Sequence, residues 1–566
     1  MVFIFEKKVK TKNKTYTYLC LGHTKRVNGK SKRVWEVILC RKDKIEENLD
    51  IIKRKLSRNL PEPEEYEFGL VYALYSISEM LDLAGIINSC VKKRNQGVSV
   101  GEYITLLAIN RAVSLNSKSK VSNWFNKTAL YRYFPGISDF LSVQNILNGM
   151  GYLNEETINR IEELLCKKLY SDFGLRSDCF LFDPSNFFTY IKDRKNTIAQ
   201  RGYNKKKRND LRQISVSLMV TREECNIPLM HESYEGNISD VVHFKNILER
   251  IERRFKLIGL ELPEITLVFD KGNNSNEAFR FLDSKGIHFV SSIRPSLKAS
   301  KPILEVPLSD YEELWTKKNG NKVYGYRTTT TAYLGKPNTL ISVFDEDSRE
   351  LQKHRFDEKL NSVILKLNNF IESKLNSKPQ WRDAEKVISK IRRDILNTRQ
   401  LRSLINITIT NGDKGLKLEW EINDEIYRKL INNFGKSLIF SNRNEWSSET
   451  IAKTYRAQIK IERQFKELNK RNRISIMPMY VRTDLTVRAH VFISILALLL
   501  SNLLLRKLRA SGIRESKDSC FDALENIKEI HLHYNDKDPP DIVLTRMSPF
   551  QRKLFNILGL KRFLPK

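Results

Sequence analysis

The sequence has little cysteine, and its cysteines are not paired along the chain. It contains seven in 566 residues, and no C-x-x-C spacing occurs. This pattern excludes a disulfide framework and a cysteine zinc finger, so we interpret the seven as reduced core residues. Histidine is also sparse. Of the eight histidines only His531 and His533 alternate, in a short EIHLHY run typical of one face of a strand or of a surface loop, and we assign no metal to them.

The sequence also lacks a hydrophobic run of the length that normally spans a membrane. The best candidate, residues 491–505, is short, is interrupted by three polar residues, and is bracketed by Arg488 and Arg506. A buried core helix is predicted there instead. The first ten residues, MVFIFEKKVK, place apolar before charged residues, the reverse of a secretory signal. We therefore expect a cytoplasmic, nucleoid-associated location and no membrane partner.

Acidic residues are too few to balance the basic ones. Lys plus Arg number 98 against 67 for Asp plus Glu, which gives a net charge of +31. Such a charge destabilises a compact protein by self-repulsion, so a polyanionic partner is indicated, with nucleic acid first and an anionic membrane surface second. A hydrophobic fraction of 41% is enough for folded cores, and 566 residues are too many for a single one.

The N-terminal third shows two patterns. Residues from Phe3 to Cys40 alternate polar and apolar around a turn at 27–30, which predicts a β-hairpin, and a charged helix over 46–57 leads to a Pro-containing linker at 60–63. From about Leu70 the apolar residues follow a helical period, and Ser99 with Glu102 forms a capping box. This helical domain is interpreted as a DNA-recognition module, with a structural or protein-binding bundle as the alternative.

The next block changes to strand composition. Three apolar strands, a helix over 239–258, a strand, a helix over 275–284 and a fifth strand follow in the order typical of an RNase H-like fold. Asp183 follows the first strand, CFLF, and Asp270 ends the fourth, ITLVF. Chemistry in open α/β folds collects at strand ends, although either aspartate alone could simply cap a turn.

A long helix is predicted from Ser447 to about Pro478, because no Pro or Gly interrupts this stretch. Tyr455, Gln458 and Glu462 recur on one face of it, amid many cations. The helix could be a solvated one whose Glu makes ordinary salt bridges, or Glu462 could be a metal ligand beside a phosphate-binding face. Asp183, Asp270 and Glu462 together supply hard oxygen ligands for two Mg²⁺ or Mn²⁺ ions, which suits phosphoryl transfer on nucleic acid.

These motifs resemble one known family. YRAQIKIERQFKELNKR, followed by MPMYVRTDLTVRAHVFISILALLL, resembles the C-terminal signature of insertion-sequence DDE transposases, in the branch with a Tyr-Arg-Glu-Lys pattern. Tyr455 and Glu462 match this pattern; Gln458 stands at the Arg position, and Asn469 at the Lys position with Lys470 next to it. The segments RGYNKKKRNDLRQ at 201–213 and YEGNISD at 234–240 are also similar to the family.

The resemblance implies a transposase that binds terminal inverted repeats in double-stranded DNA, as a homodimer, and catalyses metal-dependent strand cleavage and transfer. It gives the catalytic and metal-binding positions to Asp183, Asp270 and Glu462. The residues expected to bind DNA are Tyr455, Arg456, Gln458, Arg463, Lys470, Arg201, Lys205, Lys206, Lys207 and Arg208. The alternatives are a catalytically silent DNA-binding protein derived from a transposase and a structure-selective nuclease.

The predicted organisation is therefore a multidomain α+β and α/β chain, with an RNase H-like core interrupted by an α/β insertion domain. The expected domains are an N-terminal hairpin and linker (1–63), a helical domain (64–172), the first part of the core (173–296), the insertion (297–435), the second part of the core (436–508) and a helical tail (509–566). The tail is predicted to contain helices over 522–530 and 548–558 and to serve subunit contact or DNA binding.

Overall fold

The computed structural model describes residues 2–11, 14–27, 30–49, 52, 63–92, 97–134, 136–191, 197–204, 208, 210–223, 225–295, 300–412, 415–469, 473–533 and 539–565. The chain divides into two compact units. Unit 1 comprises Met1–Ile265 and Ile459–Lys566, and unit 2 comprises Thr266–Gln458. Both ends of the chain therefore belong to the same unit.

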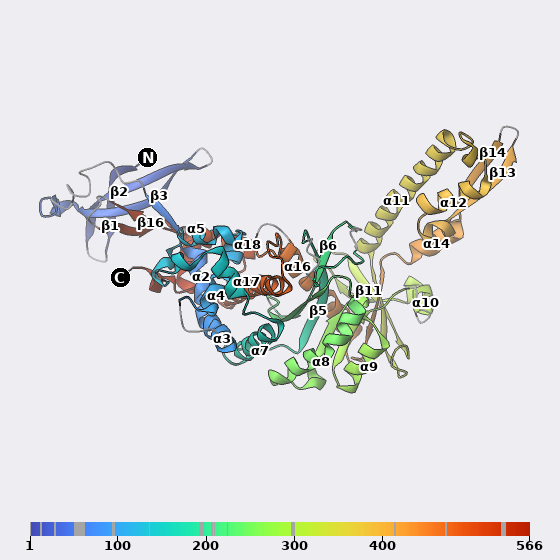
Figure 1. Cartoon of the computed structure of the whole chain (residues 1–566), viewed down its shortest axis with the longest axis horizontal. Coiled ribbons are helices and arrows are strands. Elements are labelled where there is room, and N and C mark those ends of the chain that lie inside the picture. Colours follow the sequence, from blue (N-terminus) through green and yellow to red (C-terminus); the bar gives the residue numbers. More distant parts are fainter. Residues whose placement is uncertain are drawn as a thin grey trace. The chain divides into compact units, whose positions relative to one another are not determined.

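Unit 1 begins with an antiparallel sheet in the order β1-β2-β3, formed by Val2–Lys10, Thr15–Val27 and Lys30–Arg41 (Figure 1). The predicted hairpin is thus present as β2 and β3, with β1 added at its edge. Trp35 and Leu21 are fully buried and pack against the C-terminal strand β16 (Lys528–Leu532). The turn at 28–29, most of the predicted helix over 46–57 and the linker before Pro63 lie outside the described residues.

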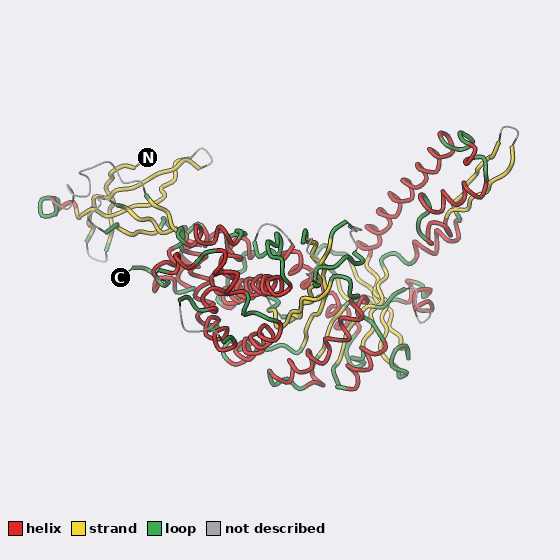
Figure 2. Tube along the Cα trace, in the orientation of Figure 1, coloured by secondary structure: helices red, strands yellow, loops and turns green. Residues whose placement is uncertain are grey.

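The helical part of unit 1 follows a short strand, β4 (Glu64–Glu67), and Figure 2 shows it as a cluster of helices beside the strand-rich N-terminal sheet. Its helices are α2 (Gly69–Met80), α3 (Leu83–Cys90), α4 (Val100–Val113), α5 (Val121–Phe125), α6 (Val143–Met150) and α7 (Glu155–Ser171). The capping box predicted at the start of α4 is confirmed, since the Ser99 hydroxyl accepts from the Glu102 backbone N–H and the Glu102 carboxylate accepts from the Ser99 backbone N–H.

The core of this helical part is α17 (Asp484–Ala510), which packs against α2 and α4. Its length and apolar composition would allow it to cross a membrane, but 83% of its most apolar stretch is buried inside the unit. The prediction of a buried core helix at 491–505 is therefore confirmed. Ser494 and Ser501, which interrupt the apolar run, are also fully buried, and Ser494 Oγ donates to the His490 carbonyl one turn earlier.

Unit 1 also contains three antiparallel strands in the order β5-β6-β7, formed by Cys179–Thr189, Arg212–Thr221 and Pro228–Glu235. The helix α8 (Asp240–Leu257) follows them. All but one residue of β6 is fully buried, including its two serines and its threonine, as expected for a strand that lies between two others, β5 and β7.

Unit 2 holds a mixed sheet in the order β10-β11-β12-β15-β9-β8. Its strands are β8 (Thr266–Phe269), β9 (His288–Ser292), β10 (Glu312–Thr316), β11 (Lys322–Thr330), β12 (Asn338–Asp345) and β15 (Lys436–Ser441), and the short helices α9 (Asn276–Ser284) and α10 (Lys301–Glu305) connect them. Only β8 and β9 are parallel within this set; the other pairs are antiparallel. The predicted order of three strands, helix, strand, helix, strand is observed along the chain from β5 to β9.

The segment predicted as an insertion contributes two structures to unit 2. The strands β10, β11 and β12 extend the sheet that contains β8 and β9. The remainder forms a lobe with its own apolar core, seen in Figure 1 as the yellow and orange elements around α11. This lobe consists of α11 (Glu346–Ser373), α12 (Ala384–Asp394), α13 (Arg399–Leu404), β13 (Ile405–Gly412), β14 (Gly415–Ile422) and α14 (Asp424–Asn432).

Two helix predictions near the C-terminus are wrong in part. The long helix expected from Ser447 is broken at Ala457 into α15 (Ser448–Arg456) and α16 (Gln458–Asn469), where the chain passes from unit 2 back into unit 1. In the tail, the helix expected over 522–530 is α18 (Lys517–Glu525). The strand interpretation of the EIHLHY run is confirmed by β16, in which Ile530 and Leu532 alternate with polar residues at the period of a strand. The predicted helix over 548–558 is confirmed as α19 (Pro549–Ile557), and β17 (Asp541–Leu544) pairs with β16.

Candidate active site

Asp183 was expected directly after the first strand, but this is wrong, because β5 continues to Thr189 and Asp183 lies within it, where the burial of the strand changes. The four preceding residues, Cys179 to Phe182, are fully buried, whereas Asp183 and the three residues after it are half-buried. Apolar side chains hold the start of β5 in the core of unit 1 and fix the backbone at Asp183. The Asp183 side chain itself is only half-buried, so solvent can reach it. Its register partner on β6 is Leu218.

Asp270 directly follows β8 in unit 2, and two hydroxyl groups donate hydrogen bonds to its carboxylate. The Ser292 hydroxyl donates to Asp270 Oδ1 at 2.7 Å, and the Tyr455 hydroxyl donates to the same oxygen at 3.0 Å. Burial by itself would raise the pKa of Asp270, but the bonds from Ser292, the Lys271 backbone and Tyr455 outweigh it and lower the pKa below its ordinary value. Asp270 is thus kept as a carboxylate, the form that binds a metal ion.

Ser292 is a site residue that the sequence reasoning missed. It ends β9, and the parallel register pairs Phe269 with Ser291, so Ser292 stands beside Asp270. The Ser292 hydroxyl also accepts a hydrogen bond from the Lys271 backbone N–H at 3.2 Å. In the sequence, Ser292 is visible only as a serine at the end of the apolar strand after Asp270. Its role becomes clear only when β8 and β9 are known to be neighbours.

The two neighbouring side chains at the end of α15 have different contacts within unit 2. Tyr455 donates to Asp270, whereas Arg456 forms an ion pair with Asp345, and its guanidinium carbon lies 4.9 Å from the ring centroid of Trp315. Both were expected to bind DNA phosphates. In the structure Tyr455 orients a carboxylate, and Arg456 is attached to the sheet of unit 2.

Glu462 projects from α16 into solvent. Its neighbours Ile461, Phe465 and Leu468 are buried and anchor the helix in unit 1. Within the part of the chain that the structure describes, the Glu462 carboxylate takes part in no hydrogen bond or ion pair, although cations surround it in the sequence. The ordinary salt bridge that was the alternative interpretation of Glu462 is therefore not observed among these residues.

Two contacts place α16 along β5. At one end Lys460 donates to the Arg222 carbonyl at 2.8 Å, and the Arg222 backbone N–H donates to the carbonyl of Cys179, the first residue of β5. At the other end the rings of Phe465 and Phe187 are 6.3 Å apart. The helix therefore runs in the same direction as the strand. Glu462 lies between its two contact points, as Asp183 does on β5.

The two sequence motifs that follow β5 meet in unit 1. Gln213 is buried, and its side-chain amide donates to the carbonyls of Tyr203 and Gly236, at 3.1 and 2.6 Å. A Cβ atom on Gly236 would lie 2.0 Å from the Gln213 carbonyl oxygen, and one on Gly202 would lie 2.3 Å from the Gly236 carbonyl oxygen. Only glycine fits at these two positions, which accounts for the glycine of each motif.

The loop between these motifs carries cationic residues expected to bind DNA. Arg201 and Arg208 are exposed, and Arg208 forms two hydrogen bonds of 2.8 and 2.7 Å with Asp210. Tyr203, which the sequence reasoning did not select, is 89% exposed. The remaining predicted residues of the loop, Lys205, Lys206 and Lys207, lie outside the described residues.

The other residues predicted to bind DNA are on α16 and just after it. Arg463 is exposed beside Glu462, whereas Gln458 is only 6% exposed and is part of the core of the protein. Lys470 lies outside the described residues. Of these three, Arg463 is the one whose described side chain faces solvent.

Comparison with known proteins gives one family match. The model of a family described as a transposase DDE domain matches residues 184–500, more than half of the 566; the match begins one residue after Asp183 and includes Asp270 and Glu462. No curated protein matches. A solved structure with a similar fold is the cryo-EM structure of the piggyBac transposase synaptic complex with hairpin DNA, with a TM-score of 0.37 and 9% identity over 89% of this chain and 88% of that chain.

Proposed function

Because the chain belongs to the transposase DDE domain family, a family of metal-dependent DNA-cleaving and DNA-joining enzymes, we propose that it catalyses transposition of an insertion sequence. The proposed reaction has two steps. The protein binds terminal inverted repeats and cuts the DNA at the ends of the element, and the freed 3′-hydroxyl groups then attack phosphodiesters of the target DNA.

The proposed catalytic residues are Asp183, Asp270 and Glu462. The observation that carries the proposal is the run of α16 along β5, because Asp183 and Glu462 each lie, in sequence, between the residues that make the two contacts of strand and helix. Two observations support it: Glu462 is exposed and pairs with no other residue that the structure describes, and Asp270 is held in its charged state.

The three carboxylates fit two Mg²⁺ or Mn²⁺ ions, since hard cations prefer oxygen ligands. Ions held there would activate a water or a DNA 3′-hydroxyl and stabilise the leaving oxygen of an in-line displacement at phosphorus. The roles of the surrounding residues follow from the geometry: Ser292 and Tyr455 keep Asp270 ionised and oriented. The order of strands and helices from β5 to β9 supports an RNase H-like core as the scaffold.

The charge of the chain supports double-stranded DNA as the partner. The exposed residues proposed to contact its phosphates are Arg201, Arg208 and Arg463, together with Lys205, Lys206, Lys207 and Lys470. Tyr203 is proposed as a further DNA contact of a different kind, because an exposed ring beside cations can stack on an unpaired base. A homodimer in the DNA complex and a cytoplasmic, nucleoid-associated location complete the proposal.

The test measures Mg²⁺-dependent nicking of DNA that carries the inverted repeats flanking the gene. Asp183→Asn, Asp270→Asn and Glu462→Gln are each expected to lower the cleavage rate roughly 10³-fold or more, because the three act as one unit. DNA affinity should persist in all of them, since the phosphate contacts remain. Wild-type cleavage by any of the three variants would remove that residue from the catalytic set.

Glu467→Gln is the matched control. Glu467 lies on the same helix as Glu462 but forms an ion pair of 2.7 Å with Lys517, so its loss should leave cleavage unchanged.

DNA affinity should also fall steeply with salt: log K should change with log[salt] by a slope of about −0.9 per neutralised phosphate. A wild-type protein that binds the repeats with this dependence but cleaves with neither Mg²⁺ nor Mn²⁺ would instead be a silent DNA-binding protein.

A further inference from the structure

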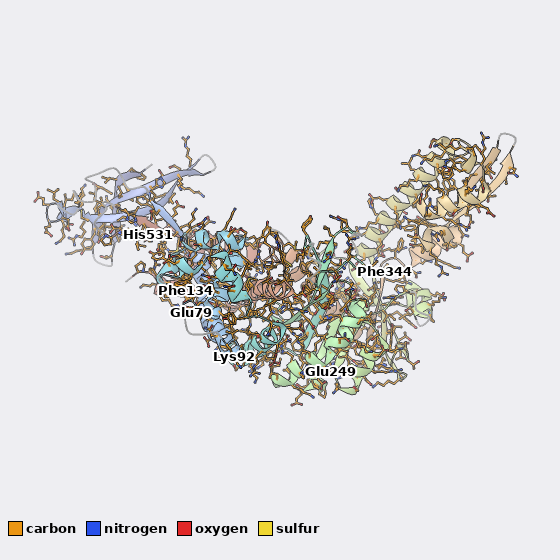
Figure 3. The ribbon with its side chains drawn as sticks, viewed as in Figure 1. Glu79, Lys92, Phe134, Glu249, Phe344 and His531 are labelled. Carbon is orange, nitrogen blue, oxygen red and sulfur yellow. The ribbon has the colours of Figure 1, made fainter. Side chains whose placement is uncertain are left out.

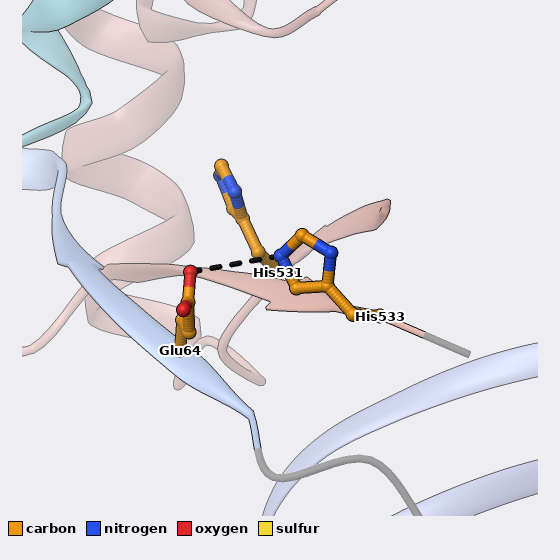
Figure 4. Close-up of side chains that lie close together, drawn as sticks. All are labelled: Glu64, His531 and His533. Carbon is orange, nitrogen blue, oxygen red and sulfur yellow. Dashed lines mark ion pairs between the residues drawn. The ribbon is translucent and has the colours of Figure 1, made fainter. Parts of the chain in front are cut away.

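A second group of metal-ligating side chains lies in unit 1, where β4 pairs with β16. The antiparallel register sets His531 directly opposite Glu64, and His533 follows His531 by two residues. One ligand atom from each of the three side chains lies within 4.8 Å of the others, and Figure 4 shows the three converging. We propose that Glu64, His531 and His533 form a binding site for one divalent transition-metal ion, with Zn²⁺ as the best fit.

The buried ligand, His531, is already oriented by a neighbouring carboxylate. Its Nε2 lies 2.7 Å from Glu529 Oε1, and Glu529 is fully buried and paired with Arg132. Because an ionised carboxylate only accepts hydrogen bonds, Nε2 carries the proton and Nδ1 keeps the lone pair that a metal needs. A histidine held in this way by a carboxylate is the usual arrangement behind a metal-binding imidazole.

The opposite ligand is also oriented. The Tyr66 hydroxyl donates to Glu64 Oε2 at 3.0 Å, and the Tyr66 ring lies 4.3 Å from the His531 ring. Tyr66 therefore supports Glu64 and covers one side of His531. A chance meeting of surface side chains would not require such partners behind two of its three members.

The ligand set selects the class of ion. Two imidazoles and one carboxylate suit borderline ions such as Zn²⁺, whereas Mg²⁺ prefers oxygen ligands alone. Ligand atoms around a tetrahedral Zn²⁺ are about 3.3 Å apart. Glu64 and His533 are 58% and 47% exposed, so a change of rotamer can bring them to this spacing while His531 stays fixed. The fourth position would be open to water.

An ion at this position would fasten the N-terminal part of unit 1 to its C-terminal strand. The other face of β16 carries Ile530 and Leu532, which pack in the core with Trp35 of the N-terminal sheet. Figure 3 shows His531 beside that sheet. The proposed site thus stabilises the strand on which the N-terminal sheet rests, and it stands whether or not the proposed transposition chemistry is correct.

The test is Zn²⁺ binding to the chelator-stripped full chain in excess Mg²⁺, read by competition with a chromogenic chelator. Wild type should bind one tight equivalent, and Glu64→Gln and His533→Ala should each bind it at least about 10-fold more weakly. Both side chains are exposed, so these variants should fold. His354→Ala is the matched control, because His354 lies 3.7 Å from Glu358 in an exposed pair that has no third ligand among the described residues.

Two further readouts separate a metal site from an ordinary ion pair between Glu64 and His533. Co²⁺ in the site should give the visible absorption of a tetrahedral complex, and Zn²⁺ should slow amide exchange in β4 and β16 of wild type and His354→Ala but not of the two site variants. Equal Zn²⁺ affinity in wild type, Glu64→Gln and His533→Ala would overturn the proposal, as would a wild type without a tight equivalent.

Discussion

The hydrogen bond from Ser292 to Asp270 gives a quantitative prediction for Ser292→Ala. The substitution removes a 2.7 Å donor from a half-buried carboxylate, and the backbone N–H of Lys271 loses its hydrogen bond to the Ser292 hydroxyl as well. A hydrogen bond to a charged group contributes about 1.5–3 kcal/mol. Asp270 remains partly accessible to water, so we expect the lower end, a loss of about 1.5 kcal/mol in the local stability of unit 2 at neutral pH.

The loss should depend on pH with a definite sign. The folded pKa of Asp270 lies below its unfolded value, so the stability that its charge contributes is present above the unfolded pKa and is lost as the pH falls through the folded pKa. The difference between wild type and Ser292→Ala should therefore be full at neutral pH and should shrink below about pH 4. Ser292→Ala should also shift the acid limb of Mg²⁺-dependent cleavage to higher pH, because the Asp270 carboxylate becomes easier to protonate.

The assay is native-state hydrogen exchange of amides in β8 and β9, which reports unit 2 without assuming that the whole chain unfolds in one step. A loss of 1.5 kcal/mol speeds this exchange about 10-fold. A double-mutant cycle with Asp270→Asn isolates the charged part, since the same substitution should then cost about 1 kcal/mol less. Equal effects of Ser292→Ala with and without the Asp270 charge would refute the reasoning.

Three further predictions concern other parts of the chain. Gly236→Ala should cost about 2–3 kcal/mol in unfolding stability, because its Cβ would lie 2.0 Å from the Gln213 carbonyl oxygen; Gly412→Ala, where the nearest atom is 3.4 Å away, should cost much less. Leu367→Ala should cost about 3 kcal/mol and speed amide exchange mainly within the lobe of α11, since Leu367 is fully buried in that core. Burial, together with Arg111, lowers the pKa of Lys118 to about 7, so the unfolded state binds more protons between pH 7 and about 10 and wild-type stability should rise with pH in this window. Lys118→Met should remove this slope in thermal melts measured at a series of pH values. A slope unchanged from wild type would show that Lys118 does not lose its proton in the folded state in this window.

Local patterns were enough to predict most elements of the fold. The capping box at Ser99, the apolar helix at 491–505 and the order of strands and helices from β5 to β9 each depend on residues close in sequence. The errors occur where tertiary structure decides. The helix break at Ala457 coincides with the passage from unit 2 to unit 1, and the helix predicted to reach residue 530 ends at Glu525, where the chain enters β16 and pairs with β4 and β17.

The same distinction between local sequence and tertiary structure holds for the residues of the candidate site. Asp183, Asp270 and Glu462 were selected from the residues next to them in sequence, although the strand end expected at Asp183 is wrong because β5 continues to Thr189. Ser292 and Gln213 were not selected, because their roles depend on a parallel register and on the meeting of two distant glycines. Likewise, Glu64 and His531 are 467 positions apart in sequence, and only the pairing of β4 with β16 brings them together.

That pairing has a consequence for biosynthesis. The ribosome makes Glu64, in β4, 467 residues before His531, in β16, so during this interval Trp35 and the apolar side of the first sheet lack the strand that covers them. Unit 1 can acquire its native form only after β16 has been made, whereas unit 2 is a single continuous segment that can fold before β16 is made. We therefore expect chaperones to bind the nascent N-terminal sheet until β16 has been made, and we expect premature release to cause aggregation.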